Sequence, residues 1–142
     1  MEKKNLDWAN IGFGYHETEK RFVANYRNGA WDDGALTTDA NITMNECAGV
    51  LQYAQTCFEG MKAYTTEDGH IVTFRPDLNA QRMEDSCKRL EMPVFPQDRF
   101  IQAVTEVVAA NEAYVPPYGS GATLYIRPYM FGISPVIGVK PA

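Results

Sequence analysis

The sequence predicts an α+β domain in which a mainly antiparallel sheet packs against helices in two layers. The turn sequence EDGH at 67–70 separates two short runs of strand composition, which is typical of a β-hairpin. Two later segments, 77–90 and 98–113, carry apolar residues at helical spacing. Residues 122–131 then show the alternating pattern of a strand. A hairpin, two helices and a strand, in this order, predict a mixed domain with local antiparallel pairing.

The composition restricts the class of protein. A chain of 142 residues can bury one hydrophobic core, so we treat 1–142 as one domain. Its 13 Lys and Arg against 18 Asp and Glu give a net charge of −5, which argues against a nucleic-acid partner. No apolar run approaches the ~20 residues of a membrane span and no signal peptide is recognisable, so we expect a cytoplasmic protein. With 3 cysteines and 2 histidines, neither a disulfide framework nor a metal site is expected.

The first half of the chain is expected to begin irregularly. Residues 1–20 show no period and are expected to form an arm or loop. Residues 21–26 have strand composition, and Asn28-Gly29 predicts a turn after them. A helix is predicted over 45–58, ending before Gly60. Its apolar stripe consists of Cys47, Val50, Leu51, Ala54 and Phe58, and Thr43 with Glu46 fits a capping box at its start.

The helix over 77–90 raises a question about Arg82. Pro76 cannot continue a paired strand, and Asp77 can cap the helix. A spacing of four residues places side chains on the same face of a helix, and this spacing connects Leu78, Arg82, Ser86 and Leu90. Arg82 is therefore expected on or beside the inward face. A buried guanidinium must find an anion. Three interpretations remain open: a structural ion pair with a carboxylate, a shifted helix phase that leaves Arg82 in water, and a clamp for a phosphate group.

The strand over 122–131 offers a second candidate. Leu124, Ile126 and Met130 share one face, and Tyr125, Arg127, Tyr129 and Phe131 share the other. An arginine between two tyrosines could recognise a carboxylate, or it could simply stack on a tyrosine at the surface.

Glu59 has no carboxylate or histidine placed to pair with it for acid–base catalysis, and Lys62 is expected on the surface. Residues 132–142, with Gly and Pro, are expected to start a connector.

Four ordered segments resemble the signatures of the branched-chain amino-acid aminotransferases, which are pyridoxal 5′-phosphate enzymes of fold type IV. The segments are LQYAQTCFEGMKAY (51–64), FRPDLNAQRM (74–83), LYIRP (124–128) and GISPVIGV (132–139). The resemblance runs from about Phe13 to the last residue. The motif FEGMK distinguishes the chain from the D-amino-acid aminotransferases and aminodeoxychorismate lyases, which share the fold.

The resemblance implies a role for each matching residue. Arg82 would bind the phosphate of pyridoxal 5′-phosphate, the cofactor. A pocket for a branched aliphatic side chain would be lined by Phe13, Tyr53, Phe58 and Tyr125. Arg127 would meet the side-chain carboxylate when glutamate or 2-oxoglutarate occupies that pocket. Ile137 and Val139 would lie on a loop reaching the partner subunit's site, because the family is homodimeric.

The resemblance also implies that a large part of the active site lies elsewhere. In this family the Schiff-base lysine and most of the phosphate site belong to a second, larger domain, which 1–142 does not contain. We therefore expect the small N-terminal domain of an enzyme that transfers the amino group between leucine, isoleucine or valine and 2-oxoglutarate. No catalytic residue is expected in this chain, and the isolated chain is expected to be inactive. The alternative is a stand-alone, non-catalytic module for anion binding or assembly, derived from a split gene.

Overall fold

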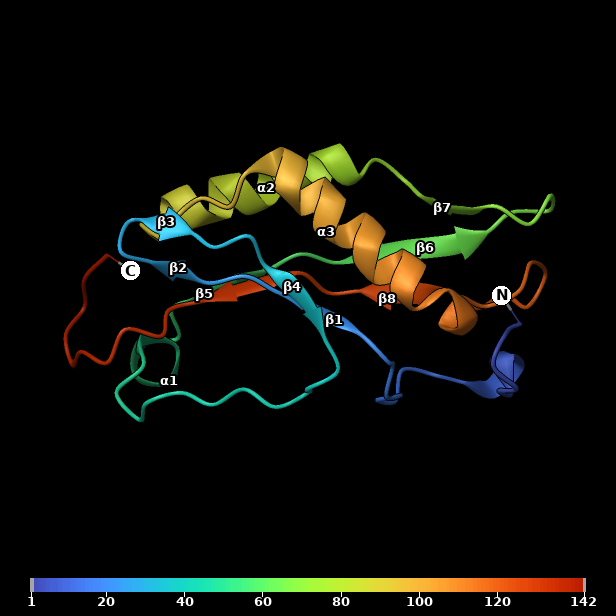
Figure 1. Ribbon diagram of the computed structural model, residues 1–142, viewed down its shortest axis with the longest axis horizontal. Helices are drawn as coiled ribbons and strands as arrows, with labels where there is room; N and C mark the ends of the chain where they lie inside the picture. Colours follow the sequence, from blue (N-terminus) through green and yellow to red (C-terminus); the bar gives the residue numbers. More distant parts are fainter. Residues whose placement is uncertain (1, 142) are drawn as a thin grey trace.

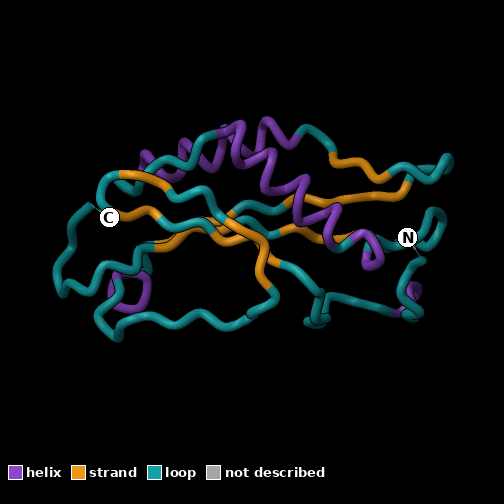
Figure 2. The backbone as a smooth tube through the Cα atoms, in the orientation of Figure 1, coloured by secondary structure: helices purple, strands orange, loops and turns teal. Residues whose placement is uncertain are grey.

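The computed structural model describes residues 2–141 and confirms the α+β prediction, with two long helices packed against antiparallel strands (Figure 1, Figure 2). Met1 and Ala142, the ends of the predicted arm and connector, lie outside the described residues. Within residues 2–141, no helix is both long and apolar enough to cross a bilayer.

The central sheet is built from two chain segments that run side by side. β6 (Met61–Thr65) lies between β7 (Ile71–Thr73) and β8 (Leu124–Ile126), and both pairings are antiparallel. The predicted hairpin around 67–70 is therefore confirmed. β5 (Thr56–Phe58) pairs with β9 (Tyr129–Phe131), so the ladder continues after a short break. The strand predicted over 122–131 is divided into β8 and β9 because Pro128, which has no backbone N–H, follows Arg127 in the gap.

Side chains alternate strictly between the two faces of this ladder. Cys57, Met61, Ala63, Ile126 and Met130 face the helices and belong to the core or pack against it. The opposite face carries exposed side chains, namely those of Phe58, Lys62, Tyr64, Tyr125, Arg127 and Tyr129. The alternation predicted for 122–131 and the surface position predicted for Lys62 are both confirmed.

Two helices cover the inner face of the sheet. α2 (Pro76–Arg89) and α3 (Gln97–Ala110) pack against each other above the strands (Figure 1). α3 buries Phe100, Val104 and Val108, as its predicted stripe requires.

The predicted inward stripe of α2 is wrong in phase. The residues that face the core are Ala80, Met83 and Cys87, whereas Leu78 and Leu90 are exposed. The reason is a close sulfur contact between the layers: the Cys57 thiol lies 3.6 Å from the Met83 sulfur, and Cys87 lies 3.5 Å from Met130. Burial raises the pKa of Cys87 to about 12, so this thiol stays protonated and packs as an apolar group.

The start of α2 also differs in detail from the prediction. Arg75, at φ +47°, is the residue that precedes the first turn, and Asp77 lies within that turn without capping it. The Asp77 carboxylate instead accepts hydrogen bonds from the Arg75 guanidinium. This acidic side chain still lies favourably near the N-terminal end of the helix dipole.

The helix predicted over 45–58 is wrong for most of its length. The structure has only α1 (Gly49–Tyr53), which begins after Ala48 with no capping side chain, and the predicted box of Thr43 and Glu46 does not form. Ala54 ends α1 in the left-handed conformation at φ +51°. The chain then turns into β5, because Thr56, Cys57 and Phe58 pair with β9 and Cys57 packs against α2. Tertiary pairing therefore overrides the local helical stripe.

The N-terminal part wraps around this core. A short 3-10 turn, η1 (Trp8–Asn10), precedes β1 (Arg21–Val23), which pairs with β4 (Ala35–Thr37). β2 (Tyr26–Arg27) and β3 (Ala30–Trp31) form a small hairpin whose turn is the predicted Asn28-Gly29, with φ of +54° and +84°.

Long-range hydrogen bonds fasten this N-terminal part to the helices. Buried Asn111, between α3 and the 3-10 turn η2 (Glu112–Tyr114), bonds both backbone groups of Lys20. The indole of Trp31 donates to the carbonyl of Val94. The two contacts hold β1 and β3 against the helix layer.

The left-handed alanine gives a direct test of this geometry. Ala54→Gly is expected to stabilise the protein by about 0.5–1 kcal/mol, because glycine adopts a positive φ without the Cβ repulsion. Urea unfolding measures the change, and Ala103→Gly in the middle of α3 serves as the control, with an expected loss of about 1 kcal/mol. A loss of stability at Ala54 would contradict the backbone conformation described.

Candidate functional site

The site lies where the two-stranded ladder is interrupted. Glu59 and Gly60 join β5 to β6, opposite Arg127 and Pro128, which join β8 to β9. The backbone N–H of Glu59 donates to the Pro128 carbonyl at 2.8 Å and holds the two breaks together. By the alternation of the ladder, the side chain of Glu59 points toward α2, and that of Arg127 points to the opposite, exposed face.

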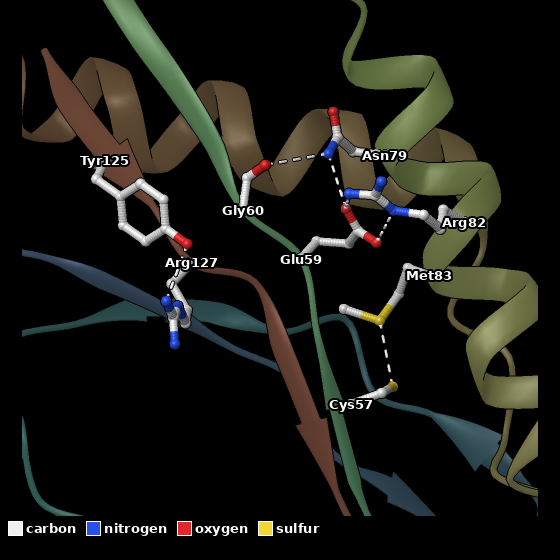
Figure 3. Close-up of polar contacts among 8 residues, drawn as sticks. All are labelled: Cys57, Glu59, Gly60, Asn79, Arg82, Met83, Tyr125 and Arg127. Carbon is white, nitrogen blue, oxygen red and sulfur yellow. Dashed lines mark hydrogen bonds and ion pairs between the residues drawn. The ribbon is translucent and has the colours of Figure 1, made fainter.

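On the helix side, Glu59 holds Arg82 through two parallel hydrogen bonds (Figure 3). Arg82 Nε donates to Glu59 Oε1 and Nη2 donates to Oε2, each at 2.6 Å. Asn79, one turn earlier in α2, donates to Glu59 Oε2 at 2.8 Å and to the Gly60 carbonyl at 3.3 Å. The carboxylate is therefore fully engaged, and the ion pair among the open interpretations of Arg82 is present.

Burial differs sharply between the two partners. The Glu59 side chain is 2% exposed, whereas that of Arg82 is 68% exposed. Burial by itself would raise the pKa of Glu59, but the hydrogen bonds from Arg82 and Asn79 outweigh it, so the pKa lies below its ordinary value. The same pairing raises the pKa of Arg82. Both groups are charged at neutral pH, and the guanidinium has a solvent-facing side.

On the other face, Arg127 lies among aromatic rings. Its Nη2 donates to the Tyr125 hydroxyl at 2.9 Å, and its guanidinium carbon lies 4.3 Å from the centre of the Phe58 ring. Phe13, from the N-terminal segment, meets Tyr125 edge to face at 6.5 Å between ring centres. Within residues 2–141, no carboxylate forms an ion pair with Arg127.

Gly60 leaves room for the Tyr125 side chain at the break between β5 and β6. A Cβ atom at this position would come within 2.5 Å of the Tyr125 hydroxyl, so only glycine leaves room for the phenol. Figure 3 shows Gly60 between the Tyr125–Arg127 pair on one side and Asn79 with Arg82 on the other. A shallow cavity of about 340 Å³ opens here. Its lining comprises Gly60, Met61, Lys62, Tyr64, Phe74, Asn79 and Tyr125.

The arrangement suits the binding of two anionic groups. The guanidinium of Arg82 keeps three N–H hydrogens that no residue among 2–141 engages, two on Nη1 and one on Nη2. An exposed, fixed guanidinium of this kind is a good donor for a phosphate, and this fits a phosphorylated cofactor. Arg127 offers a second cationic group in aromatic surroundings. Lys62 stays exposed on the strand, and no three His, Cys, Asp or Glu side chains within 2–141 are grouped for a metal ion.

Not all the expected site residues meet. Four of them form a chain of contacts: Phe13 meets Tyr125, Tyr125 bonds to Arg127, and Arg127 stacks on Phe58. The other three residues expected at the substrate site lie elsewhere: Tyr53 on α1, and Ile137 and Val139 on the segment after β9, where they are 72% and 87% exposed. That segment is joined to the α1 region by a bridge from Ala48 to Pro135 and a hydrogen bond from Gln55 to the Lys140 carbonyl.

Glu59 is the residue whose role sequence reasoning missed. The sequence places no acid or histidine to pair with it, and its partner in the structure is Arg82, a cationic residue on another layer of the fold. The available signal was the alternation of the strand. Glu59 falls between Cys57 and Met61 on the inward face, where a charge needs a partner.

The aromatic side chains that the resemblance assigns to the pocket are exposed in the structure. Phe13 is 93% exposed, Phe58 58%, and Tyr53 and Tyr125 are each 40% exposed. Aromatic side chains of this size are usually covered in a stable assembly.

Known proteins resemble this chain over nearly all of its length. A branched-chain-amino-acid aminotransferase of Haemophilus influenzae is 50% identical over 139 residues, which cover 98% of this chain and 40% of the relative. One of Helicobacter pylori is 46% identical, with 98% and 41% covered. The chain thus spans about two fifths of the length of these curated relatives. No protein-family model matches the chain.

Solved structures resemble the fold. A branched-chain amino acid aminotransferase complexed with N-(5′-phosphopyridoxyl)-L-glutamate matches with a TM-score of 0.62 and 30% identity, covering 77% of this chain and 34% of the other. The branched-chain amino acid aminotransferase of Escherichia coli matches with a TM-score of 0.66 and 25% identity, covering 89% and 36%.

The close approach at Gly60 is testable by one added methyl group. Gly60→Ala is expected to displace the Tyr125 phenol, break its bond with Arg127 and cost about 1–3 kcal/mol, as overpacking does. A crystal structure and urea unfolding of the variant measure the two effects. Gly14→Ala is the control, because its Cβ would meet only His16 at 3.9 Å. An unmoved Tyr125 at unchanged stability would refute the close contact.

Proposed function

We propose that this chain forms the small N-terminal domain of a branched-chain-amino-acid aminotransferase. The reason is the homology of 98% of the chain to such enzymes. The reaction is the transfer of the amino group between leucine, isoleucine or valine and 2-oxoglutarate. The observation that carries the proposal is the pair of fixed guanidinium groups, Arg82 and Arg127, on either side of Gly60. The homology supports the chemistry, and this geometry supports the assignment of two anion sites to Arg82 and Arg127.

The cofactor of the proposed enzyme is pyridoxal 5′-phosphate. A solved relative carries a phosphopyridoxyl derivative of glutamate, which supports this assignment. When bound, the cofactor supplies an electron sink for amino-group transfer. Arg82 contributes the N–H donors that Glu59 leaves free, and these hold the phosphate group. The residues that hold the reacting end of the cofactor, including its lysine, belong to a second, larger domain.

The substrate pocket must accept both an aliphatic and an acidic side chain. Phe13, Phe58 and Tyr125 provide its apolar wall, and Tyr53, which lies on α1 in this chain, completes the wall in the whole enzyme. Arg127 binds the side-chain carboxylate of glutamate or 2-oxoglutarate. When leucine occupies the pocket, Arg127 keeps its bond to Tyr125 and its contact with the Phe58 ring, so its charge is not left without a partner. This arrangement allows one pocket to serve two classes of substrate.

The whole enzyme is a cytoplasmic homodimer, in which Ile137 and Val139 lie on a loop that reaches the partner subunit's site. Their high exposure leaves them free to do so. The exposed face bearing Phe58 and Tyr125 is covered by the larger domain, and this accounts for its aromatic character.

Activity assays with leucine and 2-oxoglutarate test the proposed reaction. The whole protein with pyridoxal 5′-phosphate is expected to form glutamate. A polypeptide restricted to 1–142 is expected to stay at the background of free cofactor, because it lacks the lysine that holds the cofactor and moves the proton. Transamination by 1–142 alone would contradict the division of roles between the domains. An inactive whole protein would favour a binding or assembly module.

Arg127→Ala tests the dual pocket. The change is expected to raise the KM for 2-oxoglutarate and glutamate about 10–100-fold, because a charge-assisted contact of about 1.5–3 kcal/mol is lost. The KM for leucine is expected to change much less, since the aromatic wall remains. Steady-state kinetics with both substrates provide the measurement, and Arg89→Ala at the exposed end of α2 is the control. Equal losses for leucine and glutamate would exclude a carboxylate-specific role.

A further inference from the structure

Glu59 is the one charged side chain that is buried within residues 2–141. Removing a carboxylate from water is costly, and an apolar side chain at such a position often gives equal or greater stability. Its partner Arg82 is largely exposed, so the attraction between the two is weakened by solvent. Stability alone is therefore a poor reason for Glu59 to occupy this position.

The hydrogen-bond geometry indicates a better reason. An exposed arginine normally samples many rotamers, and it loses that freedom when it must bind a ligand in one orientation. Here the side-on fork of Arg82, Nε and Nη2, is fixed by both oxygens of Glu59 at 2.6 Å. The end-on fork, formed by Nη1 and the second hydrogen of Nη2, is left for another oxyanion. The guanidinium is thus oriented before any ligand arrives.

The carboxylate is itself fixed from two directions. Asn79 bonds Glu59 Oε2 and the carbonyl of Gly60, which ties α2 to the junction of β5 and β6. The backbone N–H of Glu59 is held by Pro128. The pKa of Glu59 lies below its ordinary value, so its carboxylate stays ionised and continues to accept from Arg82 throughout the neutral range.

We propose that Glu59 is a positioning residue, which orients Arg82 so that its end-on fork binds the phosphate of the cofactor. This inference rests on the proposed function, because it takes the phosphate from the cofactor assigned there. Glu59 has two opposing effects on such binding. Its negative charge weakens the attraction of Arg82 for a phosphate, whereas its two hydrogen bonds remove the cost of ordering the guanidinium. Of these two effects, the orientation of Arg82 outweighs the weakening by charge.

The experiment uses the whole protein and measures equilibrium dissociation constants for pyridoxal 5′-phosphate and for pyridoxal, which lacks the phosphate. Glu59→Gln removes the charge and turns one oxygen acceptor into a donor that opposes Arg82. The expected result is about a tenfold weaker affinity for pyridoxal 5′-phosphate and an unchanged affinity for pyridoxal. Glu84→Gln, which breaks the ion pair with Lys88 on the same helix, is the control and is expected to change neither.

Two other results would overturn the proposal. Tighter binding of pyridoxal 5′-phosphate by Glu59→Gln would mean that charge outweighs orientation. An equal loss for both ligands would mean that Glu59 only supports the fold. If Glu59→Gln does not fold, Asn79→Ala keeps both charges and removes one of the hydrogen bonds that fix the carboxylate, and a smaller loss confined to the phosphorylated ligand is then expected. No change in the ratio of the two affinities would also overturn the proposal.

Arg82→Ala separates this inference from the proposed function. If it leaves the ratio of the two affinities unchanged, the assignment of Arg82 to the phosphate fails, and the proposed cofactor site fails with it. If Arg82→Ala lowers the preference for the phosphorylated ligand but Glu59→Gln does not, the cofactor site stands and only the positioning role of Glu59 fails.

Discussion

The ion pair between Glu59 and Arg82 is the constraint on which the site depends. A carboxylate that is 2% exposed is tolerable only when all of its oxygens are engaged, and Arg82 and Asn79 together meet that condition. Both donors come from α2, so the pair fixes the helix layer to the sheet at the break between β5 and β6. The sulfur contacts of Met83 and Cys87, further along the same helix, hold the layers together beside the site.

The second organising feature is the alternation of side chains along one strand. Glu59 faces the helices and binds Arg82, which forms an inner group. Its neighbour Phe58 faces the open side and contacts Arg127, which forms an outer group. Gly60 leaves space for the Tyr125 hydroxyl, which belongs to the outer group. Arg127 is already bonded to that hydroxyl and stacked on Phe58. Each guanidinium is therefore oriented by the protein alone, which lowers the cost of binding an anion.

Much of the architecture could be predicted from local patterns, and the failures have physical causes. The turns at Asn28-Gly29 and 67–70, the buried stripe of α3 and the two faces of 122–131 follow from short-range chemistry. The helix over 45–58 failed because pairing with β9 selects a strand for 56–58. Glu59 was missed because its partner is 23 residues away on another layer, and no periodicity connects them. The resemblance to known enzymes assigned residues, but only the structure shows how Arg82 is held.

A crystal structure of the whole protein with pyridoxal 5′-phosphate would show whether Glu59 orients Arg82 for a phosphate. We expect phosphate oxygens within about 3 Å of Nη1 and Nη2 of Arg82, with both hydrogen bonds to Glu59 retained. A phosphate bound away from Arg82, or an Arg82 that leaves Glu59 to reach it, would mean that Glu59 does not orient the guanidinium for this ligand.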